Sequence, residues 1–403
     1  MRNLQQAWPV LPGVATGRGT PGGIALLTDG QEASRRDFKE FATANVEPFA
    51  GQWDREQRLP DSVVSLLGTS GYLGCCLPAE YGGRGWDTVT FGLLNEALGR
   101  VSPALAGVLT VQTMVSMALL KWGTQEQKSD WLPALARGEL IGAFALTEPG
   151  AGSDIQGLAT EFAPERGGFV LNGSKKWISC GQMAEVFLVF GKLQQRPLAC
   201  LVPRDAAGLE VEPIHELMGF RAAGLAEVRF NDVKVSSANL VGKPGFALSH
   251  VAPVGLQYGR ISTACSGLGL LRGCVEDSIA YAARRRIGDR GVGELGMIRS
   301  LIAAMGTDLE AARLLCHEAC RAQDDHLPEA FDRALMAKYF TARAAVRAAS
   351  DAVQIWGAAG CHGSSPVSRF YRDAKILEII EGTTQVHEEM LGGIFVDQAR
   401  RLQ

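Results

Sequence analysis

The stretch Phe144-Ala-Leu-Thr-Glu-Pro-Gly-Ala-Gly-Ser-Asp154 is an apolar run that passes directly into a loop of small residues. An apolar run bounded by Pro and Gly is typical of a buried strand that ends in a turn. Small side chains leave backbone N–H groups open to a planar ligand, although a tight connection between strands explains the same residues equally well. The stretch also marks the point at which the spacing of apolar residues changes.

Before this stretch the apolar spacing is helical, and after it the period is two. Residues 31–139 are therefore predicted to form an N-terminal helical domain. Short alternating runs such as Glu185–Phe190 predict a middle β domain over residues 140–245, with Asn172-Gly173 as a hairpin turn. Helical spacing returns over residues 246–403 in long Ala-rich segments, which predict an antiparallel bundle.

Composition narrows the class of protein. The chain has 403 residues, 46% apolar content and a net charge of −3, with a pI near 6.1. Such a charge gives no long-range attraction to nucleic acid or to anionic lipid. Nine cysteines without a Cys-x-x-Cys motif and six scattered histidines argue against structural zinc and against a secreted disulfide framework. A cytoplasmic protein is therefore expected.

The first residues do not have the pattern of a signal peptide. Residues 1–30 carry one early Arg and short apolar runs broken by Pro and Gly, so they are predicted to be a flexible extension and not a signal peptide. No run reaches the roughly 18 apolar residues of a membrane span. No contact with a membrane is expected.

The segment Tyr371-Arg-Asp-Ala-Lys-Ile-Leu-Glu-Ile-Ile-Glu381 has helical spacing and is followed at once by Gly382. Glycine can end a helix with a positive φ and lets a flat ligand approach the backbone. The apolar neighbours Ile379 and Ile380 disfavour a charged carboxylate, so the pKa of Glu381 should lie above its ordinary value, as suits a general base. A solvated Glu at an ordinary helix end is the simpler explanation of these residues taken alone.

Two further segments contain candidate ligand contacts. In Gly173-Ser-Lys-Lys-Trp177-Ile178-Ser179 an indole is followed two residues later by a hydroxyl, and strand alternation places both on one side. The pair could stack on a ring and bond one of its edge nitrogens, or the Trp could belong to a sheet core. In Gln354-Ile-Trp-Gly357-Ala358-Ala-Gly360 a helix breaks at Gly, which frees N–H groups for a pyrophosphate or simply caps the helix.

Four motifs together resemble the acyl-CoA dehydrogenase family, and the resemblance extends from about Glu32 to the C-terminus. It implies a mainly α fold with a central β domain: an N-terminal helical domain, a middle β-barrel or sandwich and a C-terminal four-helix bundle. It implies an FAD-dependent dehydrogenase of acyl thioesters, although a fold alone does not settle the reaction. The motifs are Thr147 to Asp154, Lys175 to Ser179, Gln354 to Gly360, and Arg372-Asp-Ala-Lys with Glu381-Gly-Thr383.

The resemblance also implies which residues hold FAD between the β domain and the bundle. Leu146 and Thr147 would lie near the pyrimidine edge of the flavin, while Trp177 would cover the ring system and Ser179 would place a hydroxyl near N5. A neighbouring subunit would offer Arg285 and the Gln354 to Ala358 segment to the pyrophosphate. No residue is predicted to bind a metal. The complete predicted cofactor set is Phe144, Leu146, Thr147, Gly152, Ser153, Trp177, Ile178, Ser179, Arg285, Gln354, Gly357, Ala358, Thr383 and Gln385.

Glu381 matches the catalytic base of the family, which removes the α-proton while the β-hydrogen leaves as hydride to flavin N5. Its own N–H, with a flavin ribityl hydroxyl, would stabilise the developing enolate oxygen. Some relatives carry the base immediately before the arginine that matches Arg260, but this chain has Gly259 there. Ser153, Arg260 and Gly382 are the residues predicted to bind substrate. Arg260 could pair with a small polar or acidic acyl group, or could form a structural ion pair.

Departures from the family pattern point to a particular branch. Relatives usually carry Arg-x-Gln-Phe-Gly where this chain has Arg285-Arg-Ile287-Gly288-Asp289, which removes an aromatic contact and puts the cross-subunit grip on FAD in doubt. The hairpin over residues 189–198 is also shorter than in most fatty-acyl enzymes. Four segments are more similar to enzymes that oxidise acyl groups on carrier proteins in polyketide extender-unit pathways, such as hydroxymalonyl formation. They are that hairpin, Arg221 to Gly224, Tyr258 to Arg260 and Glu378 to Glu381.

The expected partners follow from the same resemblance. The substrate handle would be CoA or an acyl carrier protein, the electron acceptor a separate flavoprotein, and the assembly a homodimer or homotetramer. An acyl-CoA oxidase or flavin monooxygenase on the same fold is the alternative within the enzyme class. A non-catalytic or nucleic-acid-binding flavoprotein is the alternative of another class; the acidic pI argues against nucleic acid, and the presence of Glu381 argues against loss of catalysis.

Overall fold

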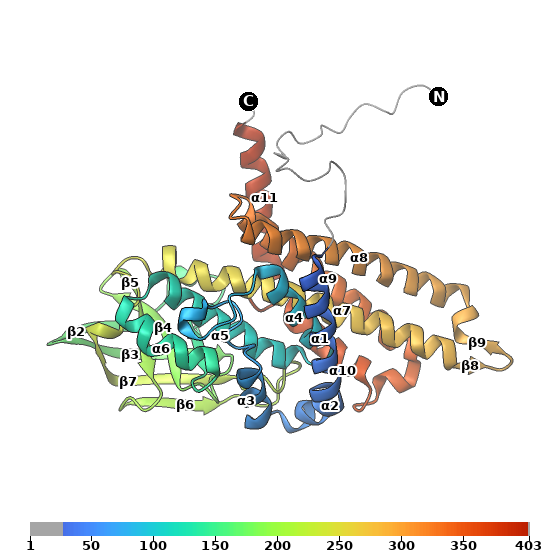
Figure 1. The fold of residues 1–403 in the computed structure, drawn as a ribbon, viewed down its shortest axis with the longest axis horizontal. Helices are drawn as coiled ribbons and strands as arrows, with labels where there is room; N and C mark the ends of the chain where they lie inside the picture. Colours follow the sequence, from blue (N-terminus) through green and yellow to red (C-terminus); the bar gives the residue numbers. More distant parts are fainter. Residues whose placement is uncertain (1–26, 402–403) are drawn as a thin grey trace.

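The computed structural model describes residues 27–401, with a curled sheet at one end of the molecule and long C-terminal helices that extend to the opposite end (Figure 1). The order of helices, strands and helices confirms the predicted fold class. Residues 1–26 of the predicted N-terminal extension lie outside the described residues. The last two residues of that extension, Asp29 and Gly30, already belong to the first helix, so the extension ends earlier than predicted.

Polar caps start several of the N-terminal helices. Thr28 and Gln31 form a reciprocal capping box at the first helix, and the Asp87 side chain accepts a hydrogen bond from the Thr90 N–H at the fourth. Pro103 occupies the first turn of the fifth, where its missing N–H costs nothing. The helices are α1 (Asp29–Asn45), α2 (Glu47–Glu56), α3 (Asp61–Thr69), η1 (Ala79–Tyr81), α4 (Thr88–Val101), α5 (Pro103–Trp122) and α6 (Gln125–Arg137).

α5 is the most apolar of these helices. Its mean hydropathy of 1.6 over at least 18 residues is enough for a membrane span, which corrects the expectation that no segment approaches this limit. However, 83% of its most apolar window is buried inside the protein, where α5 packs against α7 and β1. Among the described residues it is the one helix that passes this test, and packing in the core accounts for its composition.

The central sheet has seven strands in the order β1-β4-β2-β3-β7-β6, with β5 paired to β4. Val186, Leu188 and Phe190 of β4 enter a core shared with α5 and α6, while Phe187 and Val189 pack among the other strands. β4 is therefore apolar on both faces, whereas the sequence analysis predicted alternation in this run. The strands are β1 (Gly142–Ala145), β2 (Glu161–Glu165), β3 (Gly168–Ile178), β4 (Val186–Leu193), β5 (Arg196–Pro203), β6 (Leu209–Pro213) and β7 (Ala226–Ser236), with η2 (Ile155–Gly157) and η3 (Ser237–Asn239) beside them.

The structure contains the short hairpin expected over residues 189–198 but not the hairpin turn predicted at Asn172-Gly173. The β4–β5 hairpin turns at Gln194 and is as short as predicted. Asn172-Gly173, predicted as a hairpin turn, instead lies inside β3 at a bulge, where the register with β7 shifts. Gly173 has φ +144°, and a Cβ there would lie 2.8 Å from the Cα of Thr160. The bulge and the close neighbour, not a turn, explain the glycine.

The C-terminal bundle is built from α7, α8, α9 and α10, and α11 leaves it to stand out from the body of the molecule (Figure 1). The three long helices coincide closely with the Ala-rich segments of the sequence. Their bounds, with those of the shorter elements, are η4 (Ala247–Val251, a π-helical turn), α7 (Ala252–Arg284), β8 (Arg286–Ile287), β9 (Arg290–Gly291), η5 (Val292–Glu294), α8 (Gly296–Asp324), α9 (Ala330–Trp356), η6 (Gly357–Cys361), α10 (Pro366–Leu377) and α11 (Thr384–Arg401).

Glycines let α7 lie directly on α4. A Cβ at Gly269 would come within 2.0 Å of the carbonyl oxygen of Glu96, and a Cβ at Gly99 within 2.2 Å of that of Ser266. The backbones of the two helices are therefore in contact where these residues meet. This joins the N-terminal helices to the bundle and fixes the position of α7, which carries part of the candidate site.

Candidate active site

Glu381 lies in the turn between α10 and α11. The helix ends at Leu377, four residues before Glu381, so the prediction that Glu381 closes a helix is wrong. Glu381 has φ +55° and Gly382 has φ +98°. A left-handed conformation is unusual for Glu and costs on the order of 1–3 kcal/mol, so surrounding contacts must hold it. The positive φ predicted for Gly382 is present.

The Glu381 carboxylate points at a space that a glycine provides. A Cβ at Gly259 of α7 would lie 2.2 Å from Oε2 of Glu381. That oxygen is buried and has no hydrogen-bond partner among the described residues. Burial raises the pKa of Glu381 to about 7, while Arg260 and Lys338 oppose the shift. A buried carboxylate with a free oxygen and such a pKa is suited to accept a proton.

One face of α7 brings Glu381 and the β1 segment together. A Cβ at Gly255, one helical turn before Gly259, would lie 2.6 Å from the Phe144 ring, and the carbonyl oxygen of Met114 lies 3.3 Å from the same point. Phe144 and Glu381 therefore lie against consecutive turns of α7, Phe144 at Gly255 and Glu381 at Gly259. The sequence placed Phe144 and Glu381 in one site, and the structure brings them together.

Arg260 is a buried cation next to this centre. Its side chain is 9% exposed, its guanidinium lies 5.2 Å from the ring centroid of Phe331, and its Nε is buried without a hydrogen-bond partner among the described residues. Burial lowers the pKa of Arg260, and the nearby Glu381 opposes that shift. A buried guanidinium without an ion pair can donate hydrogen bonds to a carboxylate or carbonyl group of a ligand.

Two buried residues behind the turn were missed by the sequence analysis. Lys338 of α9 donates to the carbonyl oxygen of Gly382 at 2.5 Å, and His387 of α11 bonds the carbonyl oxygen of Glu381 at 3.2 Å. Nothing in the sequence distinguishes them from surface residues of an Ala-rich or polar helix. Beside them, Thr383 caps the start of α11 by accepting from the Val386 N–H at 3.3 Å.

A buried ion pair supports the loop that follows β1. Lys175 is fully buried and donates to Glu148 at 2.7 Å and to the carbonyl oxygen of Leu146 at 2.9 Å. Glu148 in turn accepts from the N–H groups of Ala159 and Thr160. Burial lowers the pKa of Lys175 to about 8, and Glu148 opposes the shift. The start of the predicted cofactor loop is thus fixed to Lys175 and to the backbone just before β2.

The Trp177 segment differs in detail from the strand that was predicted. Trp177 has φ +61° and is 52% exposed, and the register of β3 shifts between Lys175 and Ile178. Ile178 is buried in the sheet core, and Ser179 lies beyond the strand and is half-buried. Simple alternation therefore does not relate Trp177 to Ser179, and Ile178 can offer a ligand only its backbone.

The residues predicted to hold pyrophosphate lie at the other end of the molecule. Tyr281 of α7 and Trp356 of α9 stack with their ring centroids 4.6 Å apart, which joins the ends of these two helices. Figure 1 shows this end, marked by β8 and β9, opposite the central sheet along the long axis. The predicted pyrophosphate contacts are all exposed at this end, namely Arg285, Gln354, Gly357 and Ala358. One chain therefore does not bring them to Trp177.

The altered segment Ile287-Gly288-Asp289 turns the small β8–β9 hairpin. Gly288 has φ +56°, which the turn requires, and Ile287 is 62% exposed. The segment therefore lies on the surface, with Ile287 where the family pattern has Gln and Gly288 where it has Phe.

Several exposed features of the predicted cofactor segments fit a flavin. A flat apolar surface is available in the exposed indole of Trp177, and Gly152 and Ser153 leave an accessible backbone in the loop after β1. Half-buried Thr147 adds a hydroxyl at the edge of this region. Gln385, also predicted to contact the cofactor, is exposed at the start of α11. An aromatic face, open N–H groups and a hydroxyl are the contacts a planar ring with polar edges needs.

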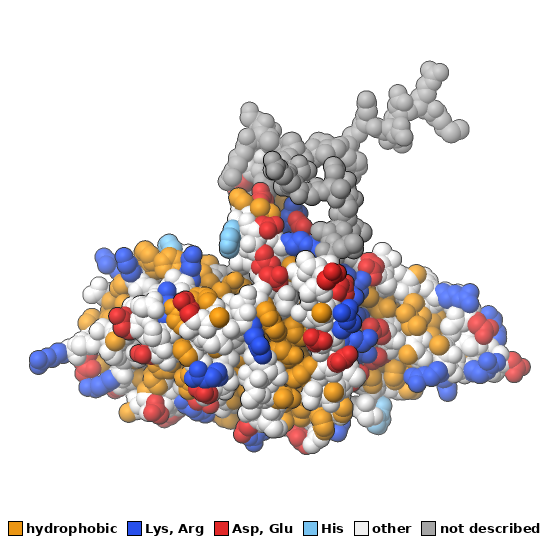
Figure 2. Space-filling view, in the orientation of Figure 1, with side chains coloured by type: hydrophobic (Ala, Val, Ile, Leu, Met, Phe, Trp, Pro, Cys, Tyr) orange, Lys and Arg blue, Asp and Glu red, His pale blue; other side chains and the backbone are white. Residues whose placement is uncertain are grey.

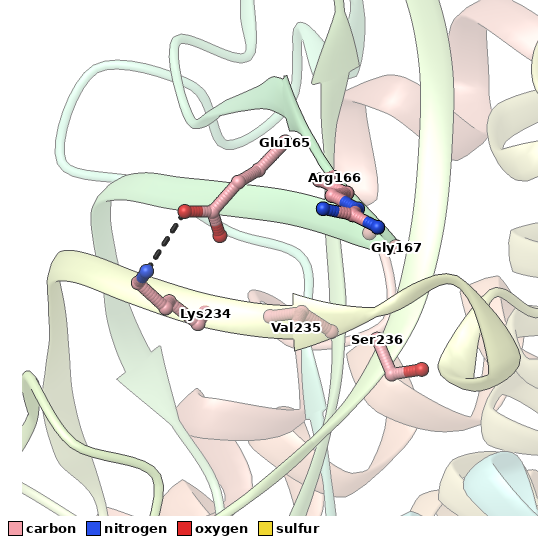
Figure 3. A pocket seen from close by; sticks show the side chains of 7 residues that line it. Glu165, Arg166, Gly167, Lys234, Val235 and Ser236 are labelled. Carbon is pink, nitrogen blue, oxygen red and sulfur yellow. Dashed lines mark hydrogen bonds and ion pairs between the residues drawn. The ribbon is translucent and has the colours of Figure 1, made fainter.

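One surface hollow lies apart from these residues. Figure 3 shows it between the β2–β3 turn and β7, where Glu165 and Lys234 form an ion pair at 2.8 Å beside Arg166 and Ser236. None of its lining residues belongs to the predicted site. It is a shallow feature of the sheet edge and not the centre of the chemistry.

Sequence models of three domains of one family match this chain in order. The N-terminal domain of acyl-CoA dehydrogenase matches residues 28–139, the middle domain residues 143–233 and the C-terminal domain residues 249–393. Among curated proteins, the acyl-CoA dehydrogenase of Bacillus subtilis (strain 168) is 34% identical over 91% of this chain and 99% of its own length. The glutaryl-CoA dehydrogenase of Desulfococcus multivorans is 33% identical over 87% and 92%.

Solved structures are similar over nearly the whole chain. Butyryl-CoA dehydrogenase from Megasphaera elsdenii has a TM-score of 0.89 at 29% identity, covering 92% of this chain and 99% of its own. The prolyl acyl carrier protein oxidase AnaB has a TM-score of 0.87 at 25% identity, covering 92% and 100%. FkbI, which serves biosynthesis of a methoxymalonyl extender unit of a polyketide, has a TM-score of 0.82 at 28% identity, covering 90% and 99%.

Proposed function

Because the chain belongs to the acyl-CoA dehydrogenase family, we propose that it removes the α- and β-hydrogens of an acyl thioester with Glu381 as the base. The observation that carries this role is the free, buried Oε2 of Glu381 in the space above Gly259. A pKa of about 7 leaves a large fraction of the carboxylate ionised at neutral pH while keeping it basic enough to take a carbon-bound proton.

In the proposed reaction the α C–H bond breaks and its proton moves to the Glu381 carboxylate. The thioester oxygen gains negative charge as the α-carbon loses its proton. The backbone N–H of Glu381 has no acceptor among the described residues and would donate to that oxygen. Bound FAD would supply the acceptor for the hydride that leaves the β-carbon. The thioester would lie against the backbone of Gly382, where a Cβ would meet His387 Nε2 at 2.7 Å.

The cofactor would be held by residues of two subunits. Phe144, Leu146, Thr147, Gly152, Ser153, Trp177 and Ser179 would surround the ring system of one subunit's flavin, with Thr383 and Gln385 from the α10–α11 region. Arg285 lies 26 positions after Gly259 along α7, which corresponds to about 39 Å of helix and is too far for one dinucleotide to bridge. Its partner subunit would therefore supply Arg285 and the Gln354 to Ala358 segment, as in a homodimer or homotetramer.

A carrier protein is the proposed handle of the substrate. The short β4–β5 hairpin agrees with the branch-level resemblance, and AnaB and FkbI are structural relatives whose names refer to carrier-protein and extender-unit chemistry. A small polar or acidic acyl group, of which hydroxymalonyl is one form, would place its polar end near the buried Arg260 guanidinium. Ser153, in the loop after β1, would contact the same substrate.

The remaining assignments follow from the family. A separate flavoprotein would accept the electrons, the protein would work in the cytoplasm, and residues 31–139, 140–245 and 246–403 would form its three domains. An oxidase that passes electrons to dioxygen is the second candidate, because AnaB is named as an oxidase. Figure 2 shows acidic and basic side chains interspersed on the face drawn, which gives no support to a nucleic-acid-binding role.

The test is an anaerobic titration of the purified flavoprotein with acyl-CoA and acyl-carrier-protein thioesters, followed by flavin absorbance. Bleaching by one handle and not the other would identify the carrier. In the same assay Glu381→Gln should lower the rate of bleaching by about 100-fold or more. A Glu381→Gln variant that bleaches at the wild-type rate would remove this residue from the mechanism, and a flavin that no thioester reduces would contradict the proposed reaction.

A further inference from the structure

Two consecutive carbonyl groups of the base-bearing turn are each held by a buried side chain. His387 Nε2 lies 3.2 Å from the carbonyl oxygen of Glu381, and Lys338 Nζ lies 2.5 Å from that of Gly382. Both side chains are fully buried, with 0% of their surface exposed. They come from two different helices, α11 and α9, so the turn is fixed from two directions.

The turn needs such support because its conformation is strained. Glu381 adopts φ +55° next to Gly382 at φ +98°, and neither value belongs to the helix that precedes them. One further backbone bond, from the Thr384 N–H to the carbonyl oxygen of Glu378 at 2.9 Å, closes the turn but does not bind residues 381 and 382. A left-handed Glu persists only where neighbouring groups fix it.

His387 can play this part only in one protonation state. A carbonyl oxygen accepts a hydrogen bond, so Nε2 of His387 must carry the proton, and its Nδ1 is buried without a partner among the described residues. Burial, reinforced by the charges of Lys338 and Arg260, lowers the pKa of His387 to about 3. The imidazole is therefore neutral, with the same donor, at every pH at which the enzyme would be assayed.

Lys338 contributes a charge as well as a hydrogen bond. Its ammonium has no ion pair with a carboxylate among the described residues, and the Gly382 carbonyl is its hydrogen-bond acceptor. Burial lowers the pKa of Lys338 to about 8, so the group is mainly charged at neutral pH. A buried ammonium beside Glu381 favours the ionised carboxylate.

We propose that His387 and Lys338 are positioning residues that hold the Glu381–Gly382 peptide, so that the carboxylate faces the substrate and the Glu381 N–H stays free for the thioester oxygen. This inference rests on the proposed role of Glu381 as the base. The two residues act differently: His387 fixes geometry alone, whereas Lys338 fixes geometry and also favours the ionised form of Glu381.

The charged and titratable groups around Glu381 allow these effects to be separated. They are Arg260 on α7, Lys338 on α9, His387 on α11 and Glu378 in the turn itself. Removing the neutral His387 donor should lower the rate without moving the pH at which Glu381 ionises. Removing the Lys338 charge should do both, since the opposing effect on the pKa of Glu381 is lost.

The experiment measures proton removal separately from oxidation. The holoenzyme is given an α-deuterated acyl thioester that has no β-hydrogens, and loss of deuterium to solvent is followed by mass spectrometry over a range of pH. His387→Phe, which keeps a ring but has no donor, should lower the exchange rate about 10- to 100-fold with an unchanged midpoint. His387→Gln, which keeps a donor, should recover most of the rate. Lys338→Met should lower the rate and move the midpoint upward by about one pH unit.

The controls distinguish this inference from the function on which it rests. Lys375→Met removes an exposed lysine of α10 that pairs with Glu378, and it should exchange like the wild type. Exchange that Glu381→Gln does not slow would overturn the base itself, whichever result the other variants give. Wild-type exchange in both His387→Phe and Lys338→Met, with Glu381→Gln inactive, would overturn the positioning role alone. Should His387→Phe fail to fold, an unshifted midpoint in Lys338→Met overturns it.

Discussion

At the scale of single residues, the environment of Glu381 raises the pKa of its carboxylate, which suits a base but makes the folded protein less stable at neutral and higher pH. Its carboxylate is buried against α7, and its folded pKa of about 7 lies above the ordinary value of 4.5. Between these two values the folded protein binds more protons than the unfolded chain, so stability falls as the pH rises through this window. Such a residue is retained because the reaction needs a buried base, not because the fold does.

This sign leads to a prediction for Glu381→Gln. The amide cannot ionise, so the variant should melt about 2 °C or more above the wild type at pH 8, and the difference should shrink toward zero at pH 4.5. Thermal melts followed by circular dichroism at both pH values provide the measurement. An equal shift at the two pH values would mean that ionisation of Glu381 is not the cause.

Gly259 is predicted to be as necessary as the base that it accommodates. In Gly259→Ala the new Cβ would meet Glu381 Oε2 at 2.2 Å and Met114 Sδ at 3.0 Å, so the carboxylate must leave its place. We expect kcat/KM to fall about 100-fold, because a displacement of about 1 Å can have that effect. Gly107→Ala on α5 is the matched control, since a Cβ there meets no atom within 4 Å. Comparable activity in the two variants would contradict this placement.

At the scale of elements, long periodic segments were predictable from the sequence and the turns were not. α7, α8 and α9 match the Ala-rich segments because a core-facing stripe repeated over many turns fixes a helix. The end of α10 was misplaced because Ile379 and Ile380 continue its apolar spacing into the turn. Asn172-Gly173 was misread because bulges and hairpin turns favour the same residues.

The residues of the candidate site were likewise only partly predictable from the sequence. Glu381 and the loop after β1 were found because local motifs carry them. Lys338 and His387 were not found, because their partners are carbonyl groups of the backbone, which leave no trace in the sequence. A buried lysine in a helix resembles a solvated one until the fold places its acceptor beside it.

The loop that follows β1 depends on the pair formed by Lys175 and Glu148. Lys175→Met would leave a buried carboxylate without its cation, which destabilises a protein by about 3–5 kcal/mol. The double variant Lys175→Met with Glu148→Gln removes the unpaired buried charge and keeps one amide oxygen, which can accept from one of the two N–H groups of Ala159 and Thr160. We therefore expect urea melts to show a large loss in the single variant and a partial recovery in the double. Equal losses would show that the charge pair is not what supports the loop.

At the scale of the whole molecule, α7 sets the distance between two functional ends. Its 33 residues correspond to about 50 Å, with Gly259 near the sheet and Arg285 just beyond the far end. A rigid helix of this length cannot fold back to unite the two sets of predicted cofactor residues. The proposed FAD site is therefore complete only when a second copy of the chain brings its far end to the Trp177 side of the first.

Mixing two inactive variants tests this arrangement. Arg285→Glu should lose FAD affinity, and Glu381→Gln should lose the base. If each site takes Glu381 from one subunit and Arg285 from the other, a mixed dimer contains one site with both wild-type residues and one with neither. Random reassembly of equal amounts should then restore about a quarter of the wild-type activity, measured as thioester-dependent dye reduction. If both residues of each site came from the same chain, every subunit in the mixture would carry one defect and activity would stay at the level of the separate variants.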